Sequence, residues 1–116
     1  MELVALLSSG QGTWGQVAGL INRGEWDNII LVGSSFAEKF SCDKKHEFIK
    51  VNTNQGIVEL KQDLINKLKN KIKGTEVALS VASGDGKEHM ALISALLSIP
   101  VGVRFVVLTK NGIIEL

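Results

Sequence analysis

The feature that most constrains the fold is a short apolar run without polar interruptions near the start of the chain. This run, Leu3–Leu7, ends at Ser8, Ser9 and Gly10. A continuous apolar run is typical of a strand buried on both faces, as in a parallel sheet covered by helices. Residues 28–33 repeat the pattern, and further strands are predicted at 48–51, 76–82 and 103–109. We therefore expect an α/β protein with a mainly parallel sheet.

Segments with helical spacing separate the strands. We expect a helix between Thr13 and Gly24, one helical turn at 34–40, a long helix at 57–73 and an apolar helix at 87–98. The long helix should bury a stripe made of Ile57, Leu60, Leu64, Leu68 and Ile72. Beyond the fifth strand, Asn111-Gly112 indicates a tight turn, so residues 113–116 should return antiparallel to that strand.

Repeated strand–helix–strand units determine the expected architecture. Their right-handed crossovers place helices on both faces of the sheet, which predicts a Rossmann-like three-layer sandwich. The strand order should be 3-2-1-4-5, with the last strand beside the fifth. At 116 residues the chain suits one domain spanning 1–116.

Composition argues against several partners and cofactors. Thirteen basic and twelve acidic residues leave a formal charge of +1, so no global field favours duplex nucleic acid or an anionic membrane. No run of 18 apolar residues or basic leader occurs, which predicts no membrane segment. One cysteine, Cys42, fits the reducing cytoplasm, and one Cys with two His cannot supply a four-ligand zinc site. We expect no cofactor and no metal.

The loop after the first strand is rich in glycine. Gly10, Gly12 and Gly15 match the G-x-G-x-x-G spacing, and a helix follows them. Small residues let a backbone approach phosphate, and amides at a helix start can donate to it. A dinucleotide site also predicts an acidic residue after the second strand, where Gly33-Ser34-Ser35 stands instead. The alternative is that the glycines only permit a tight turn.

A second loop with similar chemistry follows the fourth strand. It contains Ser83-Gly84-Asp85-Gly86-Lys87 and lacks the spacing of a Walker loop. Lys87 is an obvious phosphate partner. The alternative is a capped turn with Asp85 as the helix cap and Lys87 in solvent.

The expected topology brings the two loops together. Strands one and four should be neighbours whose connections leave in opposite directions, and such a switch point is where these sheets bind ligands. The predicted ligand-binding residues are Ser8, Ser9, Gly10, Gln11, Gly12, Thr13, Trp14, Ser83, Gly84, Asp85, Gly86 and Lys87. Asn52, Thr53 and Asn54 follow the third strand at the same edge, further from the switch point, and are secondary.

These two loops resemble the ligand-binding motifs of the CARF family, the CRISPR-associated Rossmann-like domains. The resemblance is carried by residues 6–13 and by residues 83–91, where a small-Gly-x-x-Lys turn leads into an apolar helix. It implies a stand-alone domain with a role in antiviral defence that senses cyclic oligoadenylates, and two subunits whose loops form one symmetric site.

The preferred function is therefore a nucleotide-sensing binding domain with no assigned catalytic residue. One alternative is a metal-independent ring nuclease, in which Lys87 or Ser9 stabilises the displaced charge and the 2′-hydroxyl of the bound RNA attacks. His89 is a candidate base, although a packed histidine is the commoner role at such a position. Another alternative is a nicotinamide-dinucleotide-binding protein. The apolar helix at 87–98 predicts a homodimer that Leu96→Glu should split.

Overall fold

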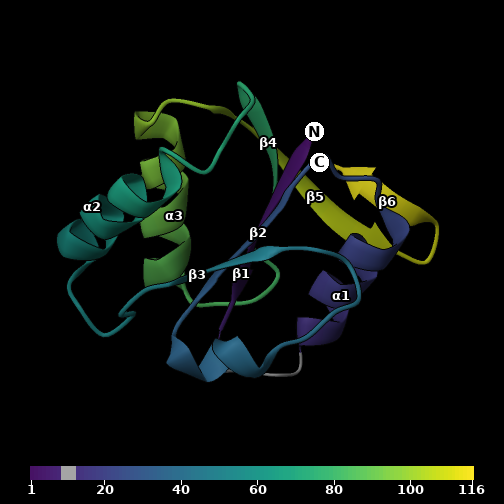
Figure 1. Ribbon diagram of the computed structural model, residues 1–116, viewed down its shortest axis with the longest axis horizontal. Helices are drawn as coiled ribbons and strands as arrows, with labels where there is room; N and C mark the ends of the chain where they lie inside the picture. Colours follow the sequence, from purple (N-terminus) through teal and green to yellow (C-terminus); the bar gives the residue numbers. More distant parts are fainter. Residues whose placement is uncertain (9–12) are drawn as a thin grey trace.

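The computed structural model describes residues 1–8 and 13–116, which form a mainly parallel six-stranded sheet (Figure 1). Its order is β3-β2-β1-β4-β5-β6, and only the β5–β6 pair is antiparallel among these strands. The predicted order is thus confirmed. The strands are β1 (Glu2–Leu7), β2 (Ile29–Gly33), β3 (Glu47–Lys50), β4 (Glu76–Ser80), β5 (Gly102–Thr109) and β6 (Gly112–Glu115).

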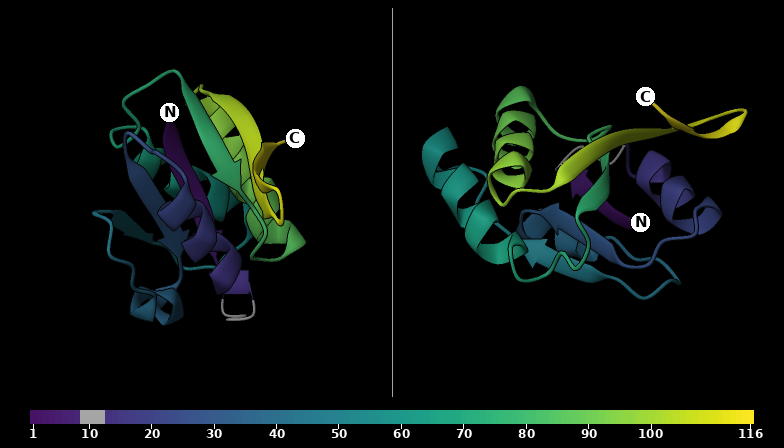
Figure 2. Two further views of the ribbon diagram at one scale, coloured as in Figure 1. Left: turned by 90° about the vertical axis from the view of Figure 1, so that its right-hand side faces the viewer. Right: turned by 90° about the horizontal axis from the view of Figure 1, so that it is seen from above.

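Helices cover both faces of the sheet (Figure 2). Helix α1 (Trp14–Arg23) packs on one face, and α2 (Ile57–Leu68) and α3 (Gly86–Ser98) pack on the other. A short 3-10 helix, η2 (Ser35–Lys39), follows β2. This arrangement is the predicted Rossmann-like three-layer sandwich.

Strand β1 lies at the centre of the core and is buried along its whole length. Leu3, Ala5 and Leu7 pack in the layer that contains α1, whereas Val4 and Leu6 pack in the layer that contains α2 and α3. Two covered faces explain why the sequence of this strand shows no polar alternation.

Helix α2 is shorter than the helix predicted at residues 57–73. It ends at Leu68 instead of residue 73, and Ile57 is exposed at its first position, while Leu60 and Leu64 are buried as expected. The Leu68 carbonyl accepts from the amides of both Lys71 and Ile72, which closes the chain into a turn. The fourth strand likewise ends at Ser80, two residues before the predicted end.

Helix α3 has one buried face and one exposed strip. Its buried side chains are Ala91, Leu92, Ala95 and Leu96, which pack with the core inside a single subunit. The exposed positions include Met90 and Leu97. Leu96 therefore belongs to the monomer core, and its assignment to a subunit interface is wrong.

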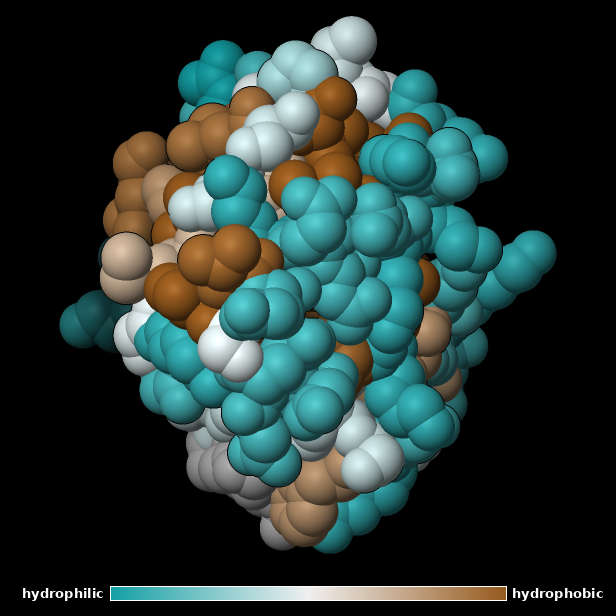
Figure 3. Space-filling model, turned by 90° about the vertical axis from the view of Figure 1, so that its left-hand side faces the viewer, coloured by the Kyte–Doolittle hydropathy of each residue, from teal (hydrophilic) through white to brown (hydrophobic). Residues whose placement is uncertain are grey.

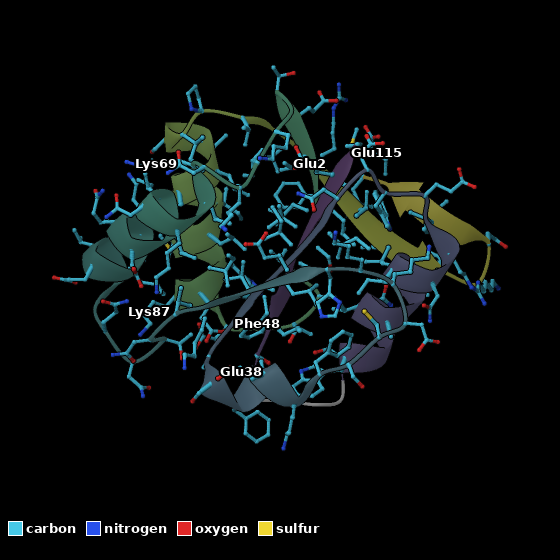
Figure 4. All side chains as sticks on the ribbon, viewed as in Figure 1. Glu2, Glu38, Phe48, Lys69, Lys87 and Glu115 are labelled. Atoms are coloured by element: carbon cyan, nitrogen blue, oxygen red, sulfur yellow. The ribbon has the colours of Figure 1, made fainter. Side chains whose placement is uncertain are left out.

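The buried carboxylate of Glu2 connects three segments near the amino ends of the parallel strands, far from Lys87 (Figure 4). The side chain of Glu2 accepts from the amides of Lys73 and Gly74, at 2.8 and 2.6 Å, and from the side-chain amide of Asn28, at 3.1 Å. Glu2 is only 4% exposed. Its carboxylate thus satisfies backbone donors where the chain turns from α2 into β4.

We expect Glu2→Ala to lower the free energy of unfolding by about 3 kcal/mol, because it leaves those donors without their charged acceptor. Glu2→Gln keeps one acceptor oxygen, so its loss should be smaller. Urea denaturation of both variants measures the difference. A loss below about 0.5 kcal/mol for Glu2→Ala, as at an ordinary surface position, would contradict this role.

Candidate functional site

The topology brings the ends of β1 and β4 together at the carboxyl edge of the sheet. The two strands are paired, and their connections lead to α1 on one face and α3 on the other. Ser8 and Ser83, 75 residues apart, consequently meet at this switch point. The Ser8 amide donates to the Ser83 hydroxyl oxygen at 2.8 Å, and the two hydroxyl oxygens lie 2.9 Å apart.

Ser83 and His89 have structural partners at this junction. Ser83 is 1% exposed, and its hydroxyl links the two strand ends. The Ser83 carbonyl lies 2.9 Å from Nε2 of His89. Because a carbonyl can only accept, Nε2 must carry the proton in this contact, and it is not presented as a base. This contact gives His89 a structural partner, and its role as a base stays an untested alternative.

Trp14 holds the start of α1 against the end of β1. Its indole N–H donates to the Ser8 carbonyl at 3.0 Å, and its ring packs against Phe36 and Phe40 with centroids 5.9 and 5.8 Å away. Thr13 occupies the N-cap position of this helix. The predicted site residues Ser9, Gly10, Gln11 and Gly12 lie outside the described residues.

Gly15, the third glycine of the G-x-G-x-x-G pattern, is not needed for packing. Within residues 1–8 and 13–116, a Cβ added there would meet no atom within 4 Å beyond its own helical turn. In a dinucleotide-binding fold the third glycine permits close packing of helix on strand. The local geometry gives no support to the dinucleotide interpretation at this position.

The turn into α3 contains a capping box. The Glu88 amide donates to the Asp85 carboxylate at 2.8 Å, and the Asp85 amide donates to the Glu88 carboxylate at 3.0 Å. Asp85 is thus the helix cap, as the alternative interpretation of this loop stated. Both carboxylates are engaged with backbone amides, which moderates the negative charge that they present to an anion here.

The two glycines of this turn have different roles. Gly84 has φ +106°, and a Cβ added to it would collide with the side chain of Leu6. Gly86 is the first residue of α3, and a Cβ added there would meet no atom within 4 Å among the described residues outside its own helical turn. Gly84 is therefore required by the fold itself, whereas the space beside Gly86 is open.

Lys87 reaches a loop that the sequence analysis treated as secondary. Its ammonium donates to the carbonyls of Thr53 and Gln55, at 2.7 and 2.9 Å, in the β3–α2 loop (residues 51–56). The part of the alternative interpretation that placed Lys87 in solvent is therefore wrong. An ammonium has three N–H bonds, so one N–H remains beyond these two carbonyls. Lys87 lies at the carboxyl edge of the sheet in Figure 4.

A polar pocket of about 380 Å³ adjoins this loop at the carboxyl ends of β2 and β3. Two of its lining residues, Lys50 and Lys67, were not identified by sequence reasoning. Their only sequence signal is that Lys50 ends a strand at this edge and Lys67 lies on the helix that follows. The pocket is lined by Ser34, Ser35, Lys50, Val51, Asn52, Thr53, Asn54 and Lys67.

Cys42, a nucleophilic side chain outside this edge of the sheet, lies in the loop before β3. The Cys42 sulfur is 3.2 Å from Nδ1 of His46, and that nitrogen is 2.9 Å from the Lys44 carbonyl. Within residues 1–8 and 13–116, no three His, Cys, Asp or Glu side chains gather as a metal site would require. In the same part of the chain, no helix has both the length and the apolar character needed to cross a bilayer.

Comparison of the chain with protein-family models and with curated proteins gives no match. The functional argument therefore rests on the geometry of the carboxyl edge. There, the serine pair, the open start of α3 and the Lys87 ammonium lie along one edge of the sheet.

Proposed function

We propose that this chain is a CARF-like nucleotide-sensing domain that binds a cyclic oligoadenylate, or a similar phosphate-bearing ligand, at the carboxyl edge of its sheet. The observation that carries the proposal is the Lys87 ammonium, which two carbonyls hold at this edge with one N–H remaining. A cation held by neutral acceptors keeps its full charge for an incoming anion.

The surroundings of Lys87 support an anionic ligand. The start of α3 carries about half a positive charge from its aligned peptide dipoles. Gly86 leaves open space beside this start, so a phosphate could approach the backbone there. The polar pocket next to Thr53 extends the same edge.

We also propose that a second copy of the chain covers the exposed strip of α3. Residues 89–103 include no Asp, Glu, Lys or Arg. Met90 and Leu97, on α3, are 62% and 59% exposed. Figure 3 shows hydrophobic side chains gathered on one side of the surface around α2 and α3, with hydrophilic side chains over much of the remainder. A solvent-facing strip of helix without charged residues favours an apolar partner.

The C-terminal hairpin extends this apolar strip. Ile114 pairs with Val107 across the antiparallel ladder, and both lie on the face of the sheet that packs Phe105 against the core around α3. Ile114 is 41% exposed and Leu116 is 79% exposed. Since α3 begins at the candidate site, an interface along this helix would bring two ligand sites close together.

Lys87→Ala should weaken the binding of cyclic tetra-adenylate by about tenfold to a hundredfold, the effect of losing a hydrogen bond to a charged group. Lys87→Met, which keeps the apolar stem, should lose a similar amount. Lys69→Ala is the matched control, because Lys69 is exposed and lies away from Lys87 in Figure 4. Isothermal titration measures the affinities, and circular dichroism verifies that each variant is folded.

Unchanged affinity in both folded Lys87 variants would refute a phosphate contact at Lys87. Titrations of the wild type with NAD, NADP and ATP test the other nucleotide classes. If NAD binds and cyclic tetra-adenylate does not, the dinucleotide alternative replaces this proposal. Chromatography of cyclic tetra-adenylate after incubation separates binding from cleavage, since a linear product would assign the protein to the ring-nuclease class.

A further inference from the structure

We infer that the pocket lined by Ser34, Lys50, Asn52 and Lys67 receives a second phosphate of the ligand whose first phosphate contacts Lys87. The inference rests on the proposed function and makes it more specific. It predicts that the ligand class is an oligonucleotide with at least two phosphates, and that a mononucleotide makes only part of the contacts.

The chemistry of the pocket favours an anion with polar substituents. Small-molecule pockets are usually lined mostly by apolar and aromatic side chains. Here seven of the eight lining residues have a hydroxyl, amide or ammonium group, and Val51 is the one apolar residue around a volume of about 380 Å³. Phosphate and ribose oxygens match these donors better than an apolar ligand does.

The pocket and Lys87 are joined through one residue. Thr53 lines the pocket, and its carbonyl accepts from the Lys87 ammonium at 2.7 Å. A phosphate at Lys87 and a phosphate in the pocket would therefore lie along one continuous stretch of the carboxyl edge. An oligonucleotide carries a phosphate for each nucleotide along its backbone, so a single ligand can reach both places.

The two lysines of the pocket can exchange their present carboxylate partners for a ligand. Lys50 pairs with Glu38 at 3.4 Å and Lys67 pairs with Asp63 at 3.3 Å, and both lysine side chains are about half exposed. Exposed ion pairs of this kind contribute little, about 0 to 1 kcal/mol, because water screens them. A phosphodiester carries one negative charge, as a carboxylate does, so it can replace the carboxylate beside each ammonium group.

Ser34 contributes a hydroxyl group that is not used in helix capping. It occupies the N-cap position of η2, yet its side chain makes no capping hydrogen bond. In most helices a serine at this position accepts from a backbone amide. Here Ser34 lies instead at the wall of the pocket, next to the lysines.

The test compares two double variants with the same change in charge. One is Lys50→Gln with Lys67→Gln, and the control is Lys69→Gln with Lys110→Gln, two exposed lysines outside the pocket lining. Each is titrated with AMP and with cyclic tetra-adenylate. The pocket variant should lose at least about tenfold in affinity for cyclic tetra-adenylate and keep its affinity for AMP. The control should keep both.

Salt dependence supplies a second readout. For single strands, each phosphate that is no longer neutralised reduces the steepness of log affinity against log salt by about 0.7, so the pocket variant, which loses one phosphate, should lose about 0.7. Affinities and slopes equal to those of the control would overturn the inference. An equal loss of affinity for AMP would also overturn the inference, because a single phosphate would then contact both Lys87 and the two pocket lysines.

These outcomes separate the inference from the proposed function. If Lys87→Ala weakens cyclic tetra-adenylate binding and the pocket variant does not, only the second phosphate site is wrong. If the folded wild type binds none of the nucleotides, both proposals are wrong. Thermal melts of the pocket variant are included because Lys67 also donates to the Lys50 carbonyl at 2.7 Å.

Discussion

Leu96→Glu is expected to unfold the protein, whereas Leu97→Glu should leave the chain folded and dissociate the proposed dimer. Leu96 is 0% exposed and belongs to the core beneath α3, but its neighbour Leu97 is 59% exposed. A glutamate at position 96 removes a buried leucine and buries a carboxylate without a partner. Together these effects lower the stability by more than about 4 kcal/mol.

The loss at position 96 approaches the whole stability of a domain, typically about 5 to 15 kcal/mol. At position 97 the free energy of unfolding of the subunit should change by only about 0.5 kcal/mol, as at other surface positions. Thermal melts followed by circular dichroism measure the first effect, and light scattering measures the second. A Leu97→Glu variant with the same oligomeric state as the wild type would exclude a second copy on this strip.

Gly84→Val should lower the free energy of unfolding by about 3 kcal/mol, before any ligand is considered. Its φ of +106° disfavours every side chain, and a β-branched one most. The new Cβ would also collide with Leu6 in the core. Valine at this position therefore tests the fold and not the approach of a phosphate.

Gly86 is the position that tests ligand approach. A Cβ added at Gly86 has open space among the described residues. The free energy of unfolding of Gly86→Ala and Gly86→Val should therefore stay within about 1 kcal/mol of the wild type. If the ligand contacts the backbone here, Gly86→Val should weaken cyclic tetra-adenylate binding, and Gly86→Ala should do so less. Urea denaturation and titration of the same samples distinguish the two glycines. Equal stability of Gly84→Val and Gly86→Val would contradict the roles assigned to them.

The sequence alone was sufficient to predict the sheet. The buried run of β1 required helices on both faces, and the Asn111-Gly112 turn required β6 to return beside β5. These features are local, and the rules for short right-handed connections leave few alternatives once the strands are known. Asp85 as a helix cap was recognisable for the same reason, since a capping box involves residues only three positions apart.

The tertiary structure decided which individual side chains of distant segments contact one another. Helix α3 is apolar around most of its surface, so its hydrophobic spacing could not show that Leu96 faces the core and Leu97 does not. The chain turns after Leu68, and the amides of Lys73 and Gly74 then donate to Glu2, about 70 residues earlier in the sequence. Lys87 similarly finds its acceptors in the β3–α2 loop, over 30 residues away. Side-chain partners of this kind depend on which loops share an edge of the folded sheet, and residue spacing along the chain does not contain that information.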